Sequence, residues 1–423
     1  MGAMPLPDST FAALRPREAG PLGIDDARRA LSASGLPVVR FTPSGERSVL
    51  GALWQADVVL DRGDGATSTL RVACAPSPPQ AAHIAATLRG AFDLLPEDVE
   101  ATRSSATSVH VVTQLAESIF DLHDLLRIVS VLAPDLTVLL DVEALAARSR
   151  DWVLEAARTK TPPAPESLFS LHAVGDTQGL WLHTHGLARL GILELDACAV
   201  PREDARGIAD MINTAAKYFL ERGVPPADEP FEVARGMPIV WLPWERGVAH
   251  VGRAGGGAHD RHTDDHRGER GILFAKTRGF FGGTKYVSLA HWSSALAGHP
   301  VFFFSDLETA RAASLAAERL PRFVQIQRRY GGQPGWRFLV KLGYTIDGAR
   351  EALDREHLWF DVHNLEGERV EATCLNQPHR VSALREGLRG THELSRLSGF
   401  TILCPQGSFD AERIDVLERA LSR

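Results

Sequence analysis

Two histidines lie two residues apart in the segment TQGLWLHTHGLARLG (177–191). On a β-strand, this spacing turns both side chains to the same face, so His183 and His185 would present two imidazoles together. If the preceding segment LFSLHAV pairs with it as a hairpin, burial of Phe169 and Leu171 on the other face puts His172 beside them. Three imidazoles on neighbouring strand positions are close enough to share a divalent ion such as zinc.

We favour a structural role for these three histidines. Zinc needs neutral imidazoles whose second nitrogens are held by partners, and the sequence offers neither a nearby cysteine nor a clear fourth ligand. His183 and His185 would instead hydrogen-bond backbone or carboxylate groups near the helix that follows. We therefore expect no bound cofactor, with a zinc ion held by His172, His183 and His185 as the alternative.

A second histidine-rich segment is GGGAHDRHTDDHRGERG (255–271). Its histidines, His259, His262 and His266, are spaced by three and four residues, which would place them on one face of a helix. Three interspersed aspartates could add carboxylate ligands. The preceding glycines and the mixed charge favour a solvated loop, so this segment is a weaker metal candidate.

A pair of carboxylates is expected on the outer face of a C-terminal hairpin. Pairing 362 with 370, 360 with 372 and 358 with 374 buries every apolar side chain of HLWFDVH and ERVEATC, and it closes the hairpin through a 364–368 loop. This register sets Asp361 opposite Glu371, a pair that could do acid–base work if one pKa were raised. We favour an ordinary solvated face, with His363 opposite Arg369 compensating the charge. The LNQPH segment (375–379) predicts a turn whose amides bond the backbone.

The elements that position these residues alternate in type. Strand patterns are followed by helical ones, and a meander comes first, which favours an α+β fold over a doubly wound one. The predicted strands and helices of the first part are strands 37–41, 51–60, 69–75, 108–114 and 136–141, and helices 78–92, 119–132 and 142–157. Further along we expect a helix at 201–223, strands within 237–251 and 271–281, a buried strand at 301–306, a helix at 307–318, strands at 336–344 and 399–404, and a helix at 410–421.

Proline- and glycine-rich stretches predict several small mixed sheet and helix modules. The expected parts are an N-terminal extension (1–36), an N-terminal α+β domain (37–160), a central α+β region of hairpin, helix and strands around the His-rich loop (166–330), and a small β-rich C-terminal module (335–423). The C-terminal module should be a small curved antiparallel sheet or a partial barrel closed by a helix.

Composition limits the classes of protein. The chain has 423 residues, 44% hydrophobic and 23% charged, which is typical of globular proteins. Its four cysteines are far apart, which indicates a reducing cytoplasm, and no apolar run reaches the length of about 18 residues that a membrane span needs. The net charge is −7, yet residues 231–355 carry 18 Lys+Arg against 12 Asp+Glu, interleaved with aromatic residues.

Two parts of the chain resemble a known family. REHLWFDVHNLEGERVEATCLNQPHRVSALREG, followed by LSGFTIL, resembles the C-terminal module of a bacterial family of unknown function. SLFSLHAVGDTQGLWLHTHGLARLGILELD and VWLPWERG resemble segments of its longer, multi-domain members, so the resemblance covers about residues 37–423. Phe400 stands where tryptophan is typical. The resemblance implies no activity, cofactor or substrate.

Our leading hypothesis is a non-enzymatic cytoplasmic protein that binds another protein. It rests on the small modules and on the lack of a G-x-S-x-G elbow, an H-E-x-x-H helix or a Walker loop in the sequence. The alternative is a metal-dependent hydrolase that uses one of the histidine clusters. A second alternative, single-stranded nucleic-acid binding through 231–355, ranks lowest because many of its aromatic residues lie in apolar runs.

Overall fold

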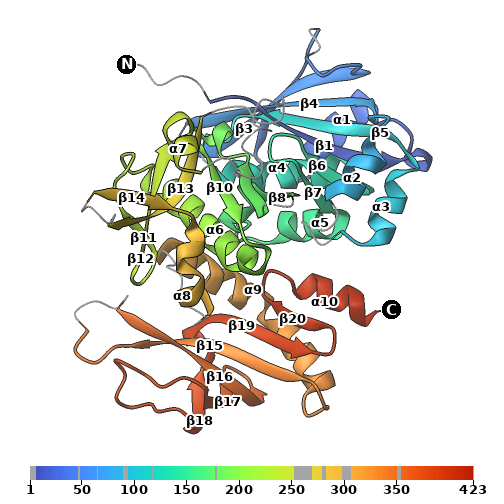
Figure 1. The fold of residues 1–423 in the computed structure, drawn as a ribbon. Helices are drawn as coiled ribbons and strands as arrows, with labels where there is room; N and C mark the ends of the chain where they lie inside the picture. The colour runs from blue at the N-terminus through green and yellow to red at the C-terminus, as the bar shows by residue number, and fades with distance from the viewer. Residues whose placement is uncertain are drawn as a thin grey trace. The chain divides into compact units, whose positions relative to one another are not determined.

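The computed structural model describes residues 6–45, 48–63, 65–88, 94–116, 118–176, 179–251, 269–278, 283–297, 306–349 and 354–422. The chain forms two compact units (Figure 1). Unit 1 comprises residues 1–157 and 163–303, and unit 2 comprises residues 158–162 and 304–423. Helices accompany three mostly antiparallel sheets, which confirms the α+β class. Among the described residues, no helix is long and apolar enough to cross a membrane.

Unit 1 begins with a seven-stranded antiparallel sheet, sheet A, in the order β2-β3-β4-β5-β1-β6-β7. Its strands are β1 (Ser9–Pro16), β2 (Val38–Pro43), β3 (Trp54–Gly63), β4 (Ala66–Pro76), β5 (Ser105–Thr113), β6 (Val138–Asp141) and β7 (Ala146–Ser149). Residues 1–36 were predicted to be an extension outside the domain, and this is wrong for residues 9–16. They form β1, which lies between β5 and β6 inside sheet A. Phe11 and Leu14 are buried on its two faces, which explains why this short apolar run becomes an interior strand.

Helices cover both faces of sheet A. α1 (Ile24–Ala33), α4 (Ile119–Leu132) and α5 (Arg150–Arg158) pack on one face, and α2 (Ala81–Leu88) and α3 (Pro96–Thr102) pack on part of the other. The helix predicted over 142–157 is wrong in its first half. Residues 146–149 form β7, because pairing with β6 outweighs the helical preference of an alanine-rich run.

The second sheet of unit 1, sheet B, has the order β11-β12-β13-β10-β9-β8, with β14 also paired to β13. Its strands are β8 (Ser170–Asp176), β9 (Gly179–His185), β10 (Glu194–Val200), β11 (Phe231–Ala234), β12 (Met237–Pro243), β13 (Arg270–Arg278) and β14 (Thr284–Val287). All its pairs are antiparallel except β10 with β13.

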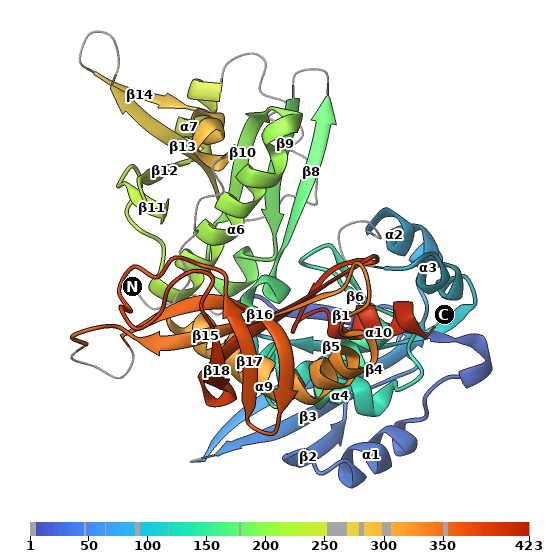
Figure 2. The ribbon, with the colours of Figure 1, turned by 90° about the horizontal axis from the view of Figure 1, so that it is seen from below.

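One helix packs on each face of sheet B. α6 (Ala205–Arg222) lies along β9 and β10 (Figure 2), and α7 (Trp244–Val251) packs on the opposite face against β12 and β13. The strand predicted through 251 instead ends at Pro243, because buried Trp244 and Gly247 begin an amphipathic helix. A short helix, α8 (Ser293–Ala297), follows β14. Residues 255–268 lie outside the described part, and so do 301–305 of the predicted buried strand.

Sheets A and B share one apolar core in unit 1. It joins Val58 and Val111 of sheet A to Leu182 and Leu273 of sheet B, with α4 and α6 contributing most of the remaining side chains. Short 3-10 helices connect elements in the described residues: η1 (Arg17–Ala19), η3 (Pro165–Leu168), η4 (Ala188–Leu190), η5 (Arg202–Asp204), η7 (Leu289–Trp292) and η8 (Leu394–Arg396).

Unit 2 is built on an open six-stranded antiparallel sheet, sheet C, in the order β18-β17-β16-β15-β19-β20. Its elements are α9 (Asp306–Tyr330), β15 (Arg337–Thr345), β16 (Arg355–Glu366), β17 (Arg369–Cys374), β18 (Arg389–Glu393), β19 (Leu397–Cys404), β20 (Gly407–Asp410) and α10 (Ile414–Leu421). α9 and α10 pack on one face around Phe323, Phe360 and Phe400. The predicted central region therefore extends too far, because α9 belongs to the core of unit 2.

The hairpin of β16 and β17 has the predicted faces but a different register. Phe360 pairs with Cys374 and Val362 with Ala372, two residues from the expected partners. A bulge follows Val362, and the turn at Gly367 has a positive φ of 56°. The extra residue in the bulge allows β16 to continue to Glu366, so the expected 364–368 loop shrinks to a tight turn.

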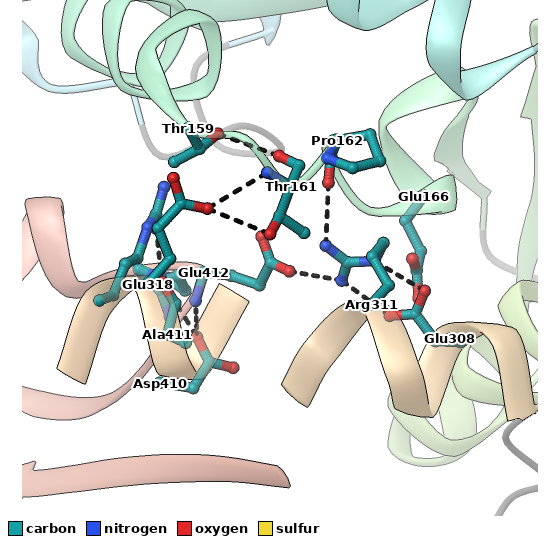
Figure 3. A network of polar contacts seen from close by, with 12 residues as sticks. Thr159, Thr161, Pro162, Glu166, Glu308, Arg311, Glu318, Asp410, Ala411 and Glu412 are labelled. Carbon is teal, nitrogen blue, oxygen red and sulfur yellow. Dashed lines mark hydrogen bonds and ion pairs between the residues drawn. The ribbon is translucent and has the colours of Figure 1, made fainter. Parts of the chain in front are cut away.

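The short segment 158–162 belongs to unit 2, where side chains of α9 hold its backbone (Figure 3). The Glu318 carboxylate accepts hydrogen bonds from the backbone N–H of Lys160 (2.7 Å) and Thr161 (3.2 Å) and from the Thr161 hydroxyl (3.1 Å). Arg311 donates to the carbonyl of Pro162 (3.2 Å), and the carboxylates of Glu308 and Glu412 hold its guanidinium. The segment is thus clamped by charged groups at two points.

Candidate functional site

The three histidines of the β8–β9 hairpin lie together, as the strand pattern predicts. His172 pairs directly with His183, and Ser170 pairs with His185, so the three imidazoles share one face. The ring centroid of His185 lies 4.9 Å from those of His172 and His183, which are 6.0 Å apart. The predicted convergence of these side chains is confirmed.

This face is part of the interior, which the sequence analysis did not expect. His183 and His185 are only 2% and 4% exposed, and His183 stacks on the fully buried Trp181 with 3.9 Å between ring centroids. Burial also lowers the pKa of His172, whose Nε2 lies 3.2 Å from the carbonyl of Leu145. Among the described residues, no group of three or more His, Cys, Asp or Glu side chains is arranged to hold a metal ion.

A buried ion pair adjoins the imidazoles on the same face. Asp196 pairs with His183 across β10 and β9, and its carboxylate accepts two hydrogen bonds of 2.9 Å from Arg270 and one of 2.7 Å from the Trp181 indole. The side chains of Asp196 and Arg270 are both fully buried. Because each charge is compensated and hydrogen-bonded, this cluster can be maintained inside the core, where an isolated charge could not be.

The remainder of the HTHGLAR string closes the hairpin end. The Glu194 carboxylate accepts hydrogen bonds from the Thr184 hydroxyl (2.6 Å) and from the backbone N–H of Gly186 (2.8 Å) and Ala188 (3.0 Å). Arg189 then forms a buried bidentate pair with Asp141 at the end of β6, with distances of 2.6 and 2.9 Å. These contacts give the string a structural explanation: it joins sheets A and B.

The predicted carboxylate pair of unit 2 does not form. Asp361 lies opposite Thr373 and makes an ion pair with Arg337 at 2.9 Å, whereas Glu371 pairs with Arg389 at 2.9 Å. The observed pairing lies two residues from the predicted one, so Asp361 and Glu371 are not opposite each other. The predicted pairing of His363 with Arg369 does not form either: the His363 Nε2 lies 2.7 Å from the Thr373 hydroxyl.

His259, His262 and His266 lie outside the described residues. In the LNQPH turn, the Asn376 side-chain carbonyl accepts a 2.7 Å hydrogen bond from the backbone N–H of Trp359, as predicted for this turn.

A groove on sheet A is a candidate ligand site in the described part of unit 1. It lies on the face that α2 and α3 cover only in part, and it has two lobes of about 690 and 440 Å³. Asp8, Arg71 and Val112 line both lobes, so the lobes meet at these residues. Volumes of this size are typical of ligand-binding clefts.

The floor of the groove is a row of side chains across four strands. Register places Thr10, Val112, Arg71 and Asp57 side by side on β1, β5, β4 and β3. Arg71 donates a 3.1 Å hydrogen bond to the Ser48 hydroxyl and lies 3.6 Å from the carboxylate of Asp57. The centre of the groove therefore carries an oriented guanidinium that is still about one-third exposed.

Each lobe has a distinct lining. The larger one is walled by apolar groups from two loops, Val49–Leu50 and Pro76–Pro79, with His110 on its floor. The smaller one is lined by hydroxyl groups of residues 67–69 and by Gln114. Burial lowers the pKa of His110, whose Nε2 lies 2.8 Å from the Ser108 hydroxyl. Its Nδ1 is buried and meets no hydrogen-bond partner among the described residues.

Sequence reasoning missed this groove. Its residues come from positions far apart in the chain, and Asp8 lies beside a strand that the sequence did not reveal. One available signal was the polar residues that alternate with buried ones along β4, among them Thr67, Thr69 and Arg71. Such alternation indicates a sheet face that helices leave open.

Comparison with known proteins gives one match. Residues 171–274 match the family model described as "Protein of unknown function (DUF4026) C-terminal". The match spans β9, β10 and α6 and includes the HTHGL and VWLPWERG strings, so the chain is similar there to a family of unknown function. The C-terminal LNQPH module lies outside it. Neither the curated proteins nor the solved structures yielded a match.

Proposed function

We propose that the protein is a binding protein that holds an extended peptide segment of a partner protein in the groove of sheet A. The observation that carries the proposal is the pair of lobes that meet at Asp8, Arg71 and Val112. A ligand that fills both lobes must be elongated, and it must pass between a carboxylate and a guanidinium. An extended peptide has this shape and offers both donors and acceptors along its length.

The lining suits such a peptide. The Pro76–Pro79 and Val49–Leu50 walls suit an apolar side chain in the larger lobe, since burying apolar surface favours association. Hydroxyl groups and Gln114 suit the backbone of the peptide in the smaller lobe. Within the described part of the chain, the exposed Asp8 carboxylate forms no ion pair, so we assign to it a basic side chain of the peptide.

We place this activity in the bacterial cytoplasm. The supporting observation is that all four cysteines are free, three of them buried. Unpaired thiols are common where the compartment is reducing.

Panning a phage library of random 12-residue peptides on the full-length protein tests the proposal. Selected peptides should bind at least about tenfold more weakly to Arg71→Ala, which removes charge-assisted hydrogen bonds. Val112→Trp should also weaken them, because it fills the space where the lobes meet. Val39→Trp is the matched control, since Val39 is 59% exposed on β2 and does not line the groove.

Peptides that bind wild type and Val112→Trp equally would place the peptide site elsewhere. Failure to select any peptide, together with a small molecule that stabilises wild type but not Val112→Trp, would identify the groove as a small-molecule site instead.

A further inference from the structure

Sheet C has a second face, opposite α9 and α10, that carries an unusual group of cationic side chains. Lys341 on β15 lies opposite Trp359 on β16, and the next pair along the same strands is Gly343 with His357. On the other side of β15, Lys341 lies opposite Gly399 of β19. Gly399 leaves space beside Lys341, since a Cβ there would meet only the Lys341 side chain at 3.7 and 4.0 Å, whereas the space over Gly343 is filled by the His357 ring.

Lys341 is half-buried without an acidic partner. Its ammonium lies 5.7 Å from the centre of the Trp359 ring, and no carboxylate in the described part of unit 2 forms an ion pair with it. Burial lowers the pKa of Lys341. Arg337, on the same face, is by contrast compensated by Asp361. A partly desolvated lysine is stabilised by an anion, and the described protein groups do not supply one.

His357 lies on the same face of the sheet as Lys341. Its Nδ1 lies 2.7 Å from the Ser398 hydroxyl, which donates its own hydrogen to the carbonyl of Lys341 at 3.2 Å. With the hydroxyl hydrogen on the Lys341 carbonyl, Ser398 accepts from Nδ1–H, and Nε2 is the nitrogen left for a ligand. A Cβ built on Gly343 would lie 3.0 Å from the imidazole, so the ring leans over this glycine.

We propose that Lys341 and His357 form the centre of a phosphate-binding site on the open face of sheet C. The Lys341 ammonium would donate to one phosphate oxygen as a point charge, and protonated His357 would donate to another from Nε2. Arg355, on the same strand as His357, adds positive charge at the rim. Trp359 is positioned to contact an aromatic group esterified to the phosphate. This site does not depend on the peptide-binding proposal.

Binding should strengthen as the pH falls. Burial lowers the pKa of His357, and the positive charges of Lys341 and Arg355 lower it further. The group that faces it from β19, Ser398, is uncharged. A bound dianion favours the charged imidazolium and so takes up a proton. Sulfate is the suitable probe for this effect, because it remains a dianion across the range in which His357 titrates.

Calorimetric titration of the full-length protein with inorganic phosphate, sulfate and phenyl phosphate tests the site. We expect Lys341→Met to weaken all three by about tenfold or more, and Lys341→Arg to restore part of the affinity because it restores the charge. Lys285→Met, at an exposed lysine of β14, should change nothing. Tighter binding of phenyl phosphate would identify an aromatic phosphate ester as the ligand class, and equal binding would identify the phosphate group alone.

A second variant protects the test against misfolding. Gly399→Asp places a carboxylate opposite Lys341, and a Cβ there meets only ordinary contacts at 3.7 and 4.0 Å from the Lys341 side chain. This internal carboxylate should compete with phosphate and abolish binding while the melting temperature is kept. The proposal is overturned if wild type binds none of the three anions at millimolar concentration. It is equally overturned if Lys341→Met and Gly399→Asp, both folded, bind phosphate like wild type.

Discussion

Gly186 shows how one residue can connect two sheets. It has a φ of +106°, and a Cβ at this position would lie 2.9 Å from the carbonyl oxygen of Leu168 and 3.1 Å from Ala144. We expect Gly186→Ala to lower the free energy of unfolding by about 3 kcal/mol, because backbone strain and a close contact with backbone act together. Urea unfolding measures this.

Gly35→Ala is the matched control for Gly186. Gly35 also has a positive φ, +74°, but a Cβ there would meet nothing within 4 Å. Its substitution should cost about 1 kcal/mol, the strain alone. Equal losses in the two variants would show that the contact with Leu168 does not contribute.

The Asp196–Arg270 pair should be the most sensitive polar contact of unit 1. Asp196→Asn leaves the fully buried guanidinium without its counter-charge, so we expect a loss of about 3–5 kcal/mol in urea unfolding. Glu393→Gln, which breaks the exposed pair with Arg369, should cost less than about 1 kcal/mol. If Asp196→Asn lowered the free energy of unfolding by less than about 1 kcal/mol as well, water would have to reach Arg270.

The histidine cluster is expected to be stable without metal. The rings of His172, His183 and His185 are packed by stacking and by the contact of His172 with Leu145. Purified untagged protein should therefore melt at the same temperature before and after dialysis against EDTA. A stoichiometric zinc content together with a lower melting temperature in EDTA would instead favour the metal-dependent alternative.

At the scale of elements, Glu318 of α9 should make unit 2 sensitive to acid. Burial raises the pKa of Glu318, but hydrogen bonds from Lys160 and Thr161 outweigh burial and hold its pKa below the usual 4.5. A carboxylate whose pKa is lower in the folded state than in the unfolded state stabilises the fold at pH values above its unfolded-state pKa. This stabilisation is lost as the pH falls through the folded-state pKa. The difference in stability between wild type and Glu318→Gln should therefore be constant above about pH 5 and shrink below pH 4.5.

The size of that difference is limited by solvent, since Glu318 is exposed. We expect about 1 kcal/mol at pH 7, measured from thermal unfolding. Glu366→Gln, at an exposed carboxylate of β16, should show no such difference at any pH. If the difference in stability between wild type and Glu318→Gln were the same at pH 3.5 as at pH 7, the ionised carboxylate would not be its source.

Element types were predictable where side-chain period was strong. Alternation alone predicted the faces of β8, β9, β16 and β17, because a slip by one residue would bury charges. It did not predict the register of β16 with β17, because a shift by two residues keeps the same side chains on each face. β1 was not predicted, because a short apolar run that is buried on both faces lacks the alternation that identifies a strand.

The candidate sites were less predictable than the elements. The three histidines of the β8–β9 hairpin converge through local pairing, which sequence can indicate. Their burial depends on Trp181, Asp196 and the turn at Ala144, which come from other elements. The groove and the Lys341 site bring together residues from three or more strands, so only the topology of sheets A and C could reveal them.

At the scale of the whole molecule, each unit has a core of its own, and each core should control its own stability. Phe360 is fully buried in the core of unit 2, and Leu125 is fully buried in that of unit 1. Phe360→Ala should destabilise unit 2 by about 3–5 kcal/mol, and Leu125→Ala should destabilise unit 1 by about 2–5 kcal/mol.

Hydrogen exchange read by mass spectrometry separates these effects, because it reports each sheet by its own peptides. We expect Phe360→Ala to accelerate exchange in β15, β16 and β19 and to leave β4 and β5 of sheet A as they are in wild type. Leu125→Ala should give the reverse pattern, and a chain with two cores should then unfold in more than one step. If either variant accelerated exchange equally in sheets A and C, the chain would instead unfold as one cooperative unit.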